Sequence, residues 1–322
     1  MSQLANDQLS EPFVVISLLN WTNYEDTIQC VQSLQKLTYK NFEILICDNA
    51  SPNDSFEQLQ IAFPTLQVHA AKENNGFAAG HYLNYLRAKE MNAAGFWILN
   101  TDLEVEMNAL SRLVEASISH VNCVFGSVSL QPDNHNLVDF GGAPLTEASK
   151  QQLHYNTWKN KEYSSLHASY PTAYEVESIE GSSFYIPMDI IAEHGFMHLD
   201  FFMYAEETDY CYRLREKGIH SMLASQSLVY HRNEGSTNSN AQLKIIPSYY
   251  RRRNALRFQH DHFTLSRWEM LTYQSGFWGN LKALINGKLS KNKEFSYYYA
   301  LACFHAAFGI KGKRIYPEKF VK

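Results

Sequence analysis

Three acidic residues follow an aromatic run and are the strongest candidates for chemistry in this chain. Glu206, Glu207 and Asp209 lie in the stretch FFMYAEETDYCYRLREKG, at the start of a segment with helical spacing. Carboxylates in poorly hydrated surroundings are costly unless they bind a cation, accept a proton or pair with a base. A short apolar segment then ends in a single histidine, His231. This pattern predicts an acid-base or cation-binding site.

A βαβα order in the first half of the chain predicts the scaffold that positions such a site. Apolar runs of strand length at 13–19, 42–47 and 96–99 alternate with helical spacing over 24–36, 76–89 and 107–118. This order is typical of an α/β domain with a mainly parallel sheet flanked by helices. Ligands of such sheets bind beyond the carboxyl ends of the strands.

Polar residues follow three of these strands. Asn20 follows the first, Asp48 the second and Asn100-Thr101-Asp102 the third. Asn and Asp are also favoured in turns and helix caps, and we interpret Asn49 in that way. For Asp48 and Asp102 we favour ligand binding, because a cleft at this sheet edge is the usual ligand site.

A Gly/Ala-rich segment that includes Asn75 and Gly76 opens the helix expected at 76–89. Its small residues would let a nucleotide approach the backbone at a helix N-terminus, and simple helix capping explains it equally well. No GxGxxG motif follows the first strand and no GxxxxGK[ST] motif occurs in the sequence. Dinucleotide-binding Rossmann and P-loop interpretations are therefore disfavoured.

Five sequence blocks in a fixed order resemble a known family. They are VVISLLNWTNYEDTIQCVQSL, CDNASPNDS, ENNGFAAGHYLN, LNTD, and FFMYAEETDYCYRLREKG with VYHRNEGS. Together they resemble glycosyltransferase family 2, most closely its bacterial rhamnosyltransferase-like branch, over about residues 12–237. A weaker similarity lies in YYRRRNALRF at 249–258. The resemblance implies a GT-A fold, in which a nucleotide-binding α/β sheet merges with an acceptor-binding region.

The expected organisation follows from this resemblance. A flexible N-terminus (1–11) precedes the glycosyltransferase domain (12–237), whose nucleotide-sugar part covers about 12–130 and whose acceptor part covers about 131–237. A basic, aromatic and mostly helical region (238–322) follows.

The resemblance also implies roles for individual residues. Asp48 would recognise a uracil or thymine base, and Asn100-Thr101-Asp102 matches a DxD-like metal motif with Asn in place of the first acid. Asp102 and His231 would bind Mg²⁺ or Mn²⁺ beneath the donor diphosphate. The expected donor-binding set is Leu18, Asn20, Asp48, Asn75, Gly76, Asn100, Thr101 and Asp102.

The general base of the family falls on Glu207, where relatives usually have Asp. Glu206 or Asp209 could share this role because the longer Glu side chain changes the reach of the carboxylate. Asp209 has an alternative interpretation, since it precedes Arg213 by four residues and would form an ion pair on the same helix.

The implied reaction is a metal-dependent, inverting sugar transfer. The donor would be dTDP-rhamnose or a UDP-sugar, and the acceptor a hydroxyl of a saccharide or lipid-linked molecule in bacterial cell-surface polysaccharide synthesis. Two alternatives are a sugar-nucleotide nucleotidyltransferase and a non-catalytic sugar-binding protein of the same fold. The segment LNWTNYED after the first strand lacks the Gly-rich basic loop expected of a nucleotidyltransferase.

Charge is distributed unevenly along the chain. Residues 1–235 hold 13 Lys and Arg against 29 Asp and Glu (−16), and residues 236–322 hold 15 against 4 (+11). This basic, aromatic part predicts a peripheral contact with the inner membrane, or docking on the acidic body of the protein. Nucleic acid is not expected as a partner. Five scattered cysteines, no visible secretory signal and no spanning apolar run predict a cytoplasmic protein, at most peripheral at the membrane.

Overall fold

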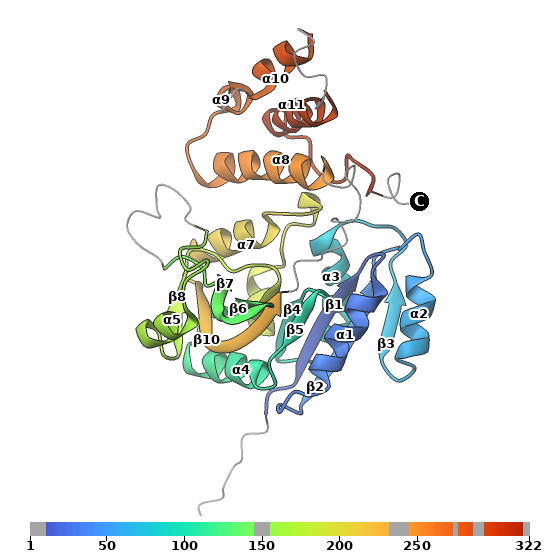
Figure 1. Ribbon diagram of the computed structural model, residues 1–322, viewed down its shortest axis with the longest axis vertical. Helices are drawn as coiled ribbons and strands as arrows, with labels where there is room; N and C mark the ends of the chain where they lie inside the picture. The colour runs from blue at the N-terminus through green and yellow to red at the C-terminus, as the bar shows by residue number, and fades with distance from the viewer. Residues whose placement is uncertain (1–10, 145–154, 232–244, 273–275, 286–292, 318–322) are drawn as a thin grey trace, which may run out of the picture.

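The computed structural model describes residues 11–144, 155–231, 245–272, 276–285 and 293–317 and contains one central sheet with helices on both faces (Figure 1). Eight strands follow the order β3-β2-β1-β4-β9-β6-β10-β5, with β7 beside β6 and β8 beside β10. The strands are β1 (Val14–Asn20), β2 (Phe42–Asp48), β3 (Gln67–Ala70), β4 (Gly95–Leu99), β5 (Leu103–Val105), β6 (Cys123–Gln131), β7 (Asn134–Phe140), β8 (Ala173–Glu175), β9 (Ser183–Pro187) and β10 (His220–His231).

The helices fall into two groups. Among the described residues, seven helices belong to the sheet domain: α1 (Tyr24–Leu34), α2 (Ser55–Ala62), α3 (Phe77–Glu90), α4 (Ala109–Ser119), α5 (Tyr163–Ser169), α6 (Met188–His194) and α7 (Glu206–Arg215). Four more form a separate layer above it in Figure 1: α8 (Ile245–His262), α9 (Arg267–Thr272), α10 (Gly276–Ile285) and α11 (Lys293–Ala307). The fold class expected from the sequence, including the helical C-terminal part, is therefore confirmed.

The register of the first strands explains why their polar ends meet. β1 pairs in parallel with β2, so that Asn20 lies opposite Asp48. β1 also pairs in parallel with β4, where Leu18 lies opposite Leu99. The residues that follow β1, β2 and β4 consequently lie at one edge of the sheet. β9 runs antiparallel to β4, which makes the second half of the sheet mixed.

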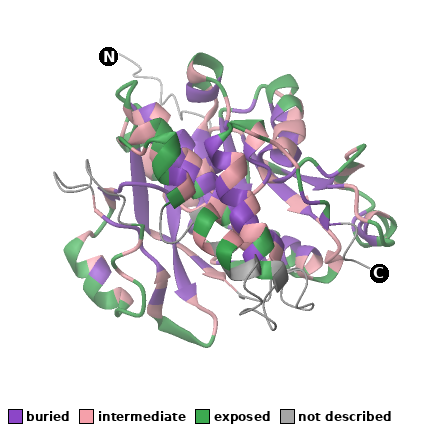
Figure 2. Ribbon diagram, turned by 90° about the horizontal axis from the view of Figure 1, so that it is seen from above, coloured by how far each residue is buried: buried purple, intermediate pink, exposed green. Residues whose placement is uncertain are grey.

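Apolar clusters cover both faces of the sheet and account for its buried strands, purple in Figure 2. One cluster joins the sheet to α3, α6 and α7, and the other joins it to α1, α2 and α4. The near-continuous burial of β1, β2 and β4 explains why these strands are uniformly apolar rather than alternating.

The C-terminal helices pack on the loop that leads into α7. Phe202 in that loop is buried against Ile246, Tyr249 and Tyr250 of α8. Within the described part of the chain, no helix combines the length and apolarity that crossing a membrane requires.

Candidate active site

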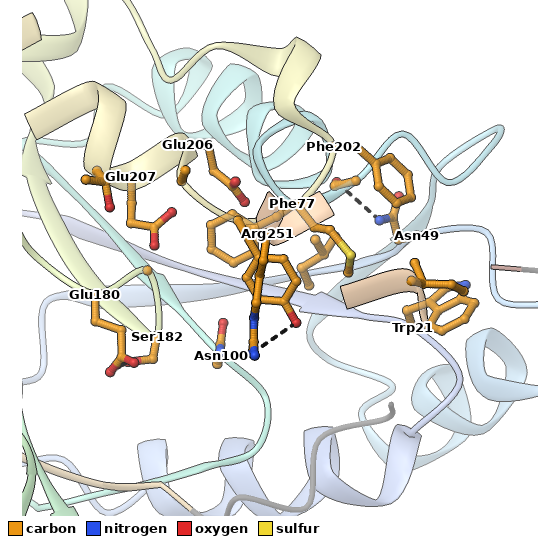
Figure 3. Close-up of a pocket in the computed structure, with 18 of the residues that line it drawn as sticks. Trp21, Asn49, Phe77, Asn100, Glu180, Ser182, Phe202, Glu206, Glu207 and Arg251 are labelled. Atoms are coloured by element: carbon orange, nitrogen blue, oxygen red, sulfur yellow. Dashed lines mark hydrogen bonds between the residues drawn. The ribbon is translucent and has the colours of Figure 1, made fainter. Parts of the chain in front are cut away.

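A cavity of about 870 Å³ lies at the carboxyl ends of β1 and β4 (Figure 3). Its wall is assembled from segments far apart in sequence: the end of β1, the turn after β4, residues 180–182 before β9, the loop 202–205 with the start of α7, and α8. The residues that line it are Leu19, Trp21, Asn49, Asn74, Gly76, Phe77, Asn100, Asp102, Tyr155, Glu180, Gly181, Ser182, Phe202, Met203, Tyr204, Ala205, Glu206, Glu207, Thr208, His231, Ile246, Arg251, Ala255 and Pro317. The cavity lies where ligands bind in open α/β sheets.

Asp102 and His231 are brought together although 129 residues separate them. His231 is the last residue of β10 and lies opposite Leu103 of β5, in antiparallel pairing, so its ring faces the neighbouring Asp102. The His231 Nε2 and Asp102 Oδ2 atoms are 3.2 Å apart. Two ligands about 2.1 Å from one cation and at right angles are about 3 Å apart, so this pair fits a divalent ion.

Negative charge surrounds His231. Burial lowers the pKa of His231, but its hydrogen bond with Asp102 and the Asp102 charge outweigh this effect and raise the pKa to about 9. Glu180 and Asp139 add further negative charge, and the Asp139 Oδ2 atom is 3.8 Å from His231 Nδ1. A metal ion would have to displace a proton from His231. No group of three or more acidic, His or Cys side chains suited to a metal occurs among the described residues.

Glu206 and Glu207 begin α7, and both line the cavity. Glu206 is 2% exposed, and its Oε2 atom has no hydrogen-bond partner in the described part of the structure. Burial, with the adjacent Glu207 charge, raises the pKa of Glu206 well above its usual value. Burial also raises the pKa of Glu207, to about 7, with a further contribution from Glu180. Glu207 is thus poised to exchange a proton near neutral pH.

Gly181 lies next to the Glu207 carboxylate. A Cβ atom built on Gly181 would lie 3.6 Å from the Glu207 carboxyl carbon, an ordinary contact, and 3.3 Å from the Phe77 ring, which is tight. In Figure 3, Glu207 and Glu180 lie on the same side of the cavity. These two acids and the Asp102–His231 pair therefore share one compartment.

The loop before α7 is held in an unusual conformation. Phe202, Tyr204 and Ala205 all have positive φ angles, of 73°, 68° and 72°. Non-glycine residues rarely adopt such angles, which cost about 1–3 kcal/mol each and persist only where the surrounding structure enforces them. The Asn254 Nδ2 atom donates to the carbonyl oxygens of Met203 at 2.7 Å and Tyr204 at 2.9 Å. Helix α8 thereby fixes the loop that presents the two acids.

Gly76 fits this loop closely. The Phe77 N–H donates to the Phe202 carbonyl oxygen at 2.7 Å, and a Cβ atom on Gly76 would lie 1.9 Å from that oxygen. Gly76 also has φ +91°, so both the contact and the backbone angle favour glycine. The segment expected to approach a nucleotide therefore also supports the loop that carries the acids.

Asp48 is not among the residues that line the cavity. It is 1% exposed, and its carboxylate accepts hydrogen bonds from Asn20 Nδ2 at 2.7 Å, Ser51 N at 2.8 Å and Ser51 Oγ at 2.6 Å. A carboxylate has about four acceptor positions, which leaves one for an N–H group of a base. Asn49, interpreted from sequence as a turn residue, lines the cavity instead, and its Oδ1 atom is buried without a partner in the described structure.

Asp209 lies outside the cavity wall. Its carboxylate pairs with Arg213 Nε at 2.8 Å and with His262 Nε2 at 2.9 Å. These contacts favour the structural alternative that the sequence left open for this residue. Of the remaining residues expected to bind the donor, Asn100 lines the cavity. Leu18, Asn75 and Thr101 are not among the lining residues; Leu18 is buried in the core and Asn75 is exposed.

Sequence reasoning missed most of the cavity wall, including Trp21, Glu180 and Arg251. Trp21 directly follows Asn20, so its position after a strand was the available signal. Glu180 lies three residues before β9 and carries no local pattern that marks it. Arg251 lies on α8, in the block 249–258 whose similarity to the family is weaker.

Comparisons with known proteins agree with this architecture. The family model described as Glycosyl transferase family 2 matches residues 13–163. A search of curated proteins found no match. The solved structure of GalNAc-T7 with UDP, GalNAc and Mn²⁺ superposes with a TM-score of 0.58 at 15% identity, covering 90% of this chain and 55% of the GalNAc-T7 chain. The chain thus spans little more than half of that relative.

A second solved structure covers nearly the whole of both chains. The mannosyltransferase PcManGT from Pyrobaculum calidifontis, in complex with GDP-Man and Mn²⁺, superposes with a TM-score of 0.54 at 10% identity, over 95% of this chain and 90% of PcManGT. At such identities the likeness establishes the fold, and it confirms the GT-A architecture expected from the sequence.

Proposed function

We propose that this protein transfers a sugar from a nucleoside-diphosphate donor to a hydroxyl group of an acceptor. The observation that carries the proposal is the shared cavity of Glu207, whose pKa lies near 7, and the Asp102–His231 pair. A base that titrates near neutral pH and a cation site are the two groups that such a transfer requires. The match to Glycosyl transferase family 2 supports the same reaction class.

Glu207 acts as the general base in this mechanism. Its carboxylate takes the proton of the acceptor hydroxyl as the hydroxyl oxygen attacks the anomeric carbon from the face opposite the diphosphate, which inverts the anomeric configuration. Burial and the neighbouring Glu207 charge raise the pKa of Glu206 well above its usual value, which favours Glu207 over Glu206 as the acceptor of the proton.

Asp102 and His231 would hold the divalent cation of the reaction. When bound, the cation would stabilise negative charge on the diphosphate leaving group. Support comes from the donor atoms themselves, a carboxylate oxygen and an imidazole nitrogen 3.2 Å apart, and from the Mn²⁺ in both solved structures of similar fold. Mn²⁺ accepts imidazole nitrogen more readily than Mg²⁺ does, so we propose Mn²⁺ as the better cofactor.

The proposal includes the chemical class of the donor and of the acceptor. Asp48 keeps one acceptor position for the N3–H group of uracil or thymine, which favours a UDP-sugar or dTDP-rhamnose. The resemblance to the rhamnosyltransferase-like branch supports rhamnose and an acceptor, saccharide or lipid-linked, in bacterial cell-surface polysaccharide synthesis.

Exposed aromatic side chains on the C-terminal helices support a peripheral membrane contact. Trp268 is 65% exposed and Trp278 is 51% exposed, and tryptophan favours the interface of a bilayer. The net charge of +11 over residues 236–322 would attract anionic lipids.

The proposal is tested by incubating the protein with UDP-, GDP- and dTDP-sugars, Mn²⁺ or Mg²⁺, and a panel of saccharide and polyprenyl-diphosphate acceptors. Release of nucleoside diphosphate that depends on the metal and the acceptor is the expected result. Pyrophosphate exchange into the sugar nucleotide would support the nucleotidyltransferase alternative instead. Binding of donor or sugar without any turnover would support a non-catalytic protein.

A further inference from the structure

Helix α8 brings a positive charge to a cavity that is otherwise rich in acids. Arg251 is the one lysine or arginine among the described residues that line it. Four acidic side chains line the same cavity: Asp102, Glu180, Glu206 and Glu207. A ligand that carries a diphosphate would meet strong repulsion here unless cations offset this charge. Figure 3 shows the Arg251 side chain extending into the cavity between these walls.

The other arginines of α8 are engaged elsewhere. Arg252 stacks on a tyrosine of α11, with its guanidinium carbon 4.6 Å from the ring centre. Arg253 is 2% exposed and donates to the carbonyl oxygens of Phe201 and Gly312, both at 2.6 Å. Arg257 forms an ion pair with an aspartate at 2.7 Å. Of these four side chains, Arg251 alone lines the cavity.

Arg251 is held beside the loop that carries the base. Its guanidinium carbon lies 4.4 Å from the centre of the Tyr204 ring, and its Nη2 atom is 3.5 Å from the Tyr204 hydroxyl. The Tyr204 carbonyl oxygen in turn accepts a hydrogen bond from Asn254, one turn further along α8. Arg251 and Glu207 are therefore positioned by the same two segments, α8 and the loop before α7. A preorganised charge near the reacting atoms favours the transition state.

We propose that Arg251 binds the β-phosphate of the sugar-nucleotide donor and stabilises the charge that develops on the leaving nucleoside diphosphate. This inference rests on the proposed function. In the transfer, the acceptor oxygen bonds to the anomeric carbon and its proton passes to Glu207. The bond from the anomeric carbon to the β-phosphate oxygen breaks, and that oxygen keeps the electron pair. The diphosphate gains one negative charge, which a planar guanidinium can bind through two parallel hydrogen bonds.

The test compares diphosphate with monophosphate binding. Affinities of UDP, GDP and dTDP, and of the matching monophosphates, are measured by calorimetry with Mn²⁺ for the wild type, Arg251→Gln and Arg251→Lys. Arg252→Gln is the matched control, since it removes the same charge from the next position of the helix. We expect Arg251→Gln to weaken the preferred diphosphate about 10- to 100-fold and its monophosphate by less than about threefold. The diphosphate affinity of Arg251→Lys should lie between those of the wild type and Arg251→Gln, and the affinity of Arg252→Gln should match that of the wild type.

The outcomes separate the two proposals. If the wild type binds none of the three diphosphates, the proposed function fails. If it binds one and Arg251→Gln binds it equally well, the function stands and the role of Arg251 is overturned. An equal loss for diphosphate and monophosphate would also overturn the assignment to the β-phosphate. Thermal unfolding of each variant checks that an affinity change reflects a folded protein, and Arg251→Lys provides the comparison if Arg251→Gln unfolds.

Discussion

Replacing Glu207 by glutamine should remove activity and, above pH 7, make the protein more stable. Burial raises the pKa of Glu207 from its ordinary value of 4.5 to about 7, so ionising this side chain costs free energy in the folded state. Each tenfold change in proton affinity corresponds to about 1.4 kcal/mol, which gives an upper limit of about 3 kcal/mol. Glu207 borders an open cavity, where water screens part of the cost, and we therefore expect about 2 kcal/mol.

The sign of this effect depends on pH. The folded protein holds the Glu207 proton more tightly than the unfolded chain does, so this stabilisation is complete below pH 4.5 and is lost as the pH rises through about 7. A glutamine side chain at this position does not titrate. The Glu207→Gln variant should therefore match the wild type near pH 4.5 and exceed it by about 2 kcal/mol at pH 8, a rise in Tm of about 3 °C for a chain of this length.

Thermal unfolding at pH 4.5 and pH 8 and initial rates of sugar transfer provide the measurements. The wild-type kcat/KM should rise with pH through about 7, and kcat of Glu207→Gln should fall at least about 100-fold. Glu216→Gln makes the same change at the exposed end of α7 and serves as the control. A Tm difference that is equal at both pH values would refute the argument from burial. Turnover within a few-fold of wild type would refute the base assignment.

Three further outcomes follow from the same geometry. Asn254→Ala removes the side chain that donates hydrogen bonds to the strained loop before α7, and it should lower the free energy of unfolding by about 2–3 kcal/mol in urea titrations. A loss below about 0.5 kcal/mol would show that these hydrogen bonds do not hold the loop. Gly76→Ala should cost about 2 kcal/mol or more in the same assay, because its Cβ would overlap the Phe202 carbonyl oxygen at a positive φ, and unchanged stability would exclude that contact. His231→Asn should raise the Mn²⁺ concentration for half-maximal activity at least about tenfold. In the wild type that concentration should fall as the pH rises towards 9, since metal and proton compete for His231, and a requirement independent of pH would argue against ligation.

The parts of the fold that the sequence predicted are those with local patterns. The uniformly apolar runs before Asn20, Asp48 and Asn100 form β1, β2 and β4, and their parallel register places those polar residues at one edge. Asp102 and His231 are different, because nothing local joins residues 129 positions apart. Their meeting depends on the antiparallel pairing of β5 with β10. Family resemblance identified them, whereas periodicity could not.

Asp48 and Asn49 show what a position at a strand end leaves open. Asp48 is the last residue of β2, and its carboxylate is buried and bonded to Asn20 and Ser51. The neighbouring Asn49 projects into the wall instead. Successive residues of a strand point to opposite faces, and the backbone turn after β2 decides which of two adjacent polar side chains lines the cavity. A sequence pattern does not specify that turn.

The loop before Glu206 explains why the helical C-terminal part belongs to the site. Glycine adopts positive φ angles more readily than other residues, yet in this loop Phe202, Tyr204 and Ala205 adopt them. The aromatic side chains of the loop pack on α8, and the backbone strain of a few kcal/mol is offset by hydrogen bonds from Asn254 to the loop carbonyls. The same helix places Arg251 in the cavity. A chain shortened after β10 would lose both, so the acid pair depends on residues that lie beyond the segment matched by the family model.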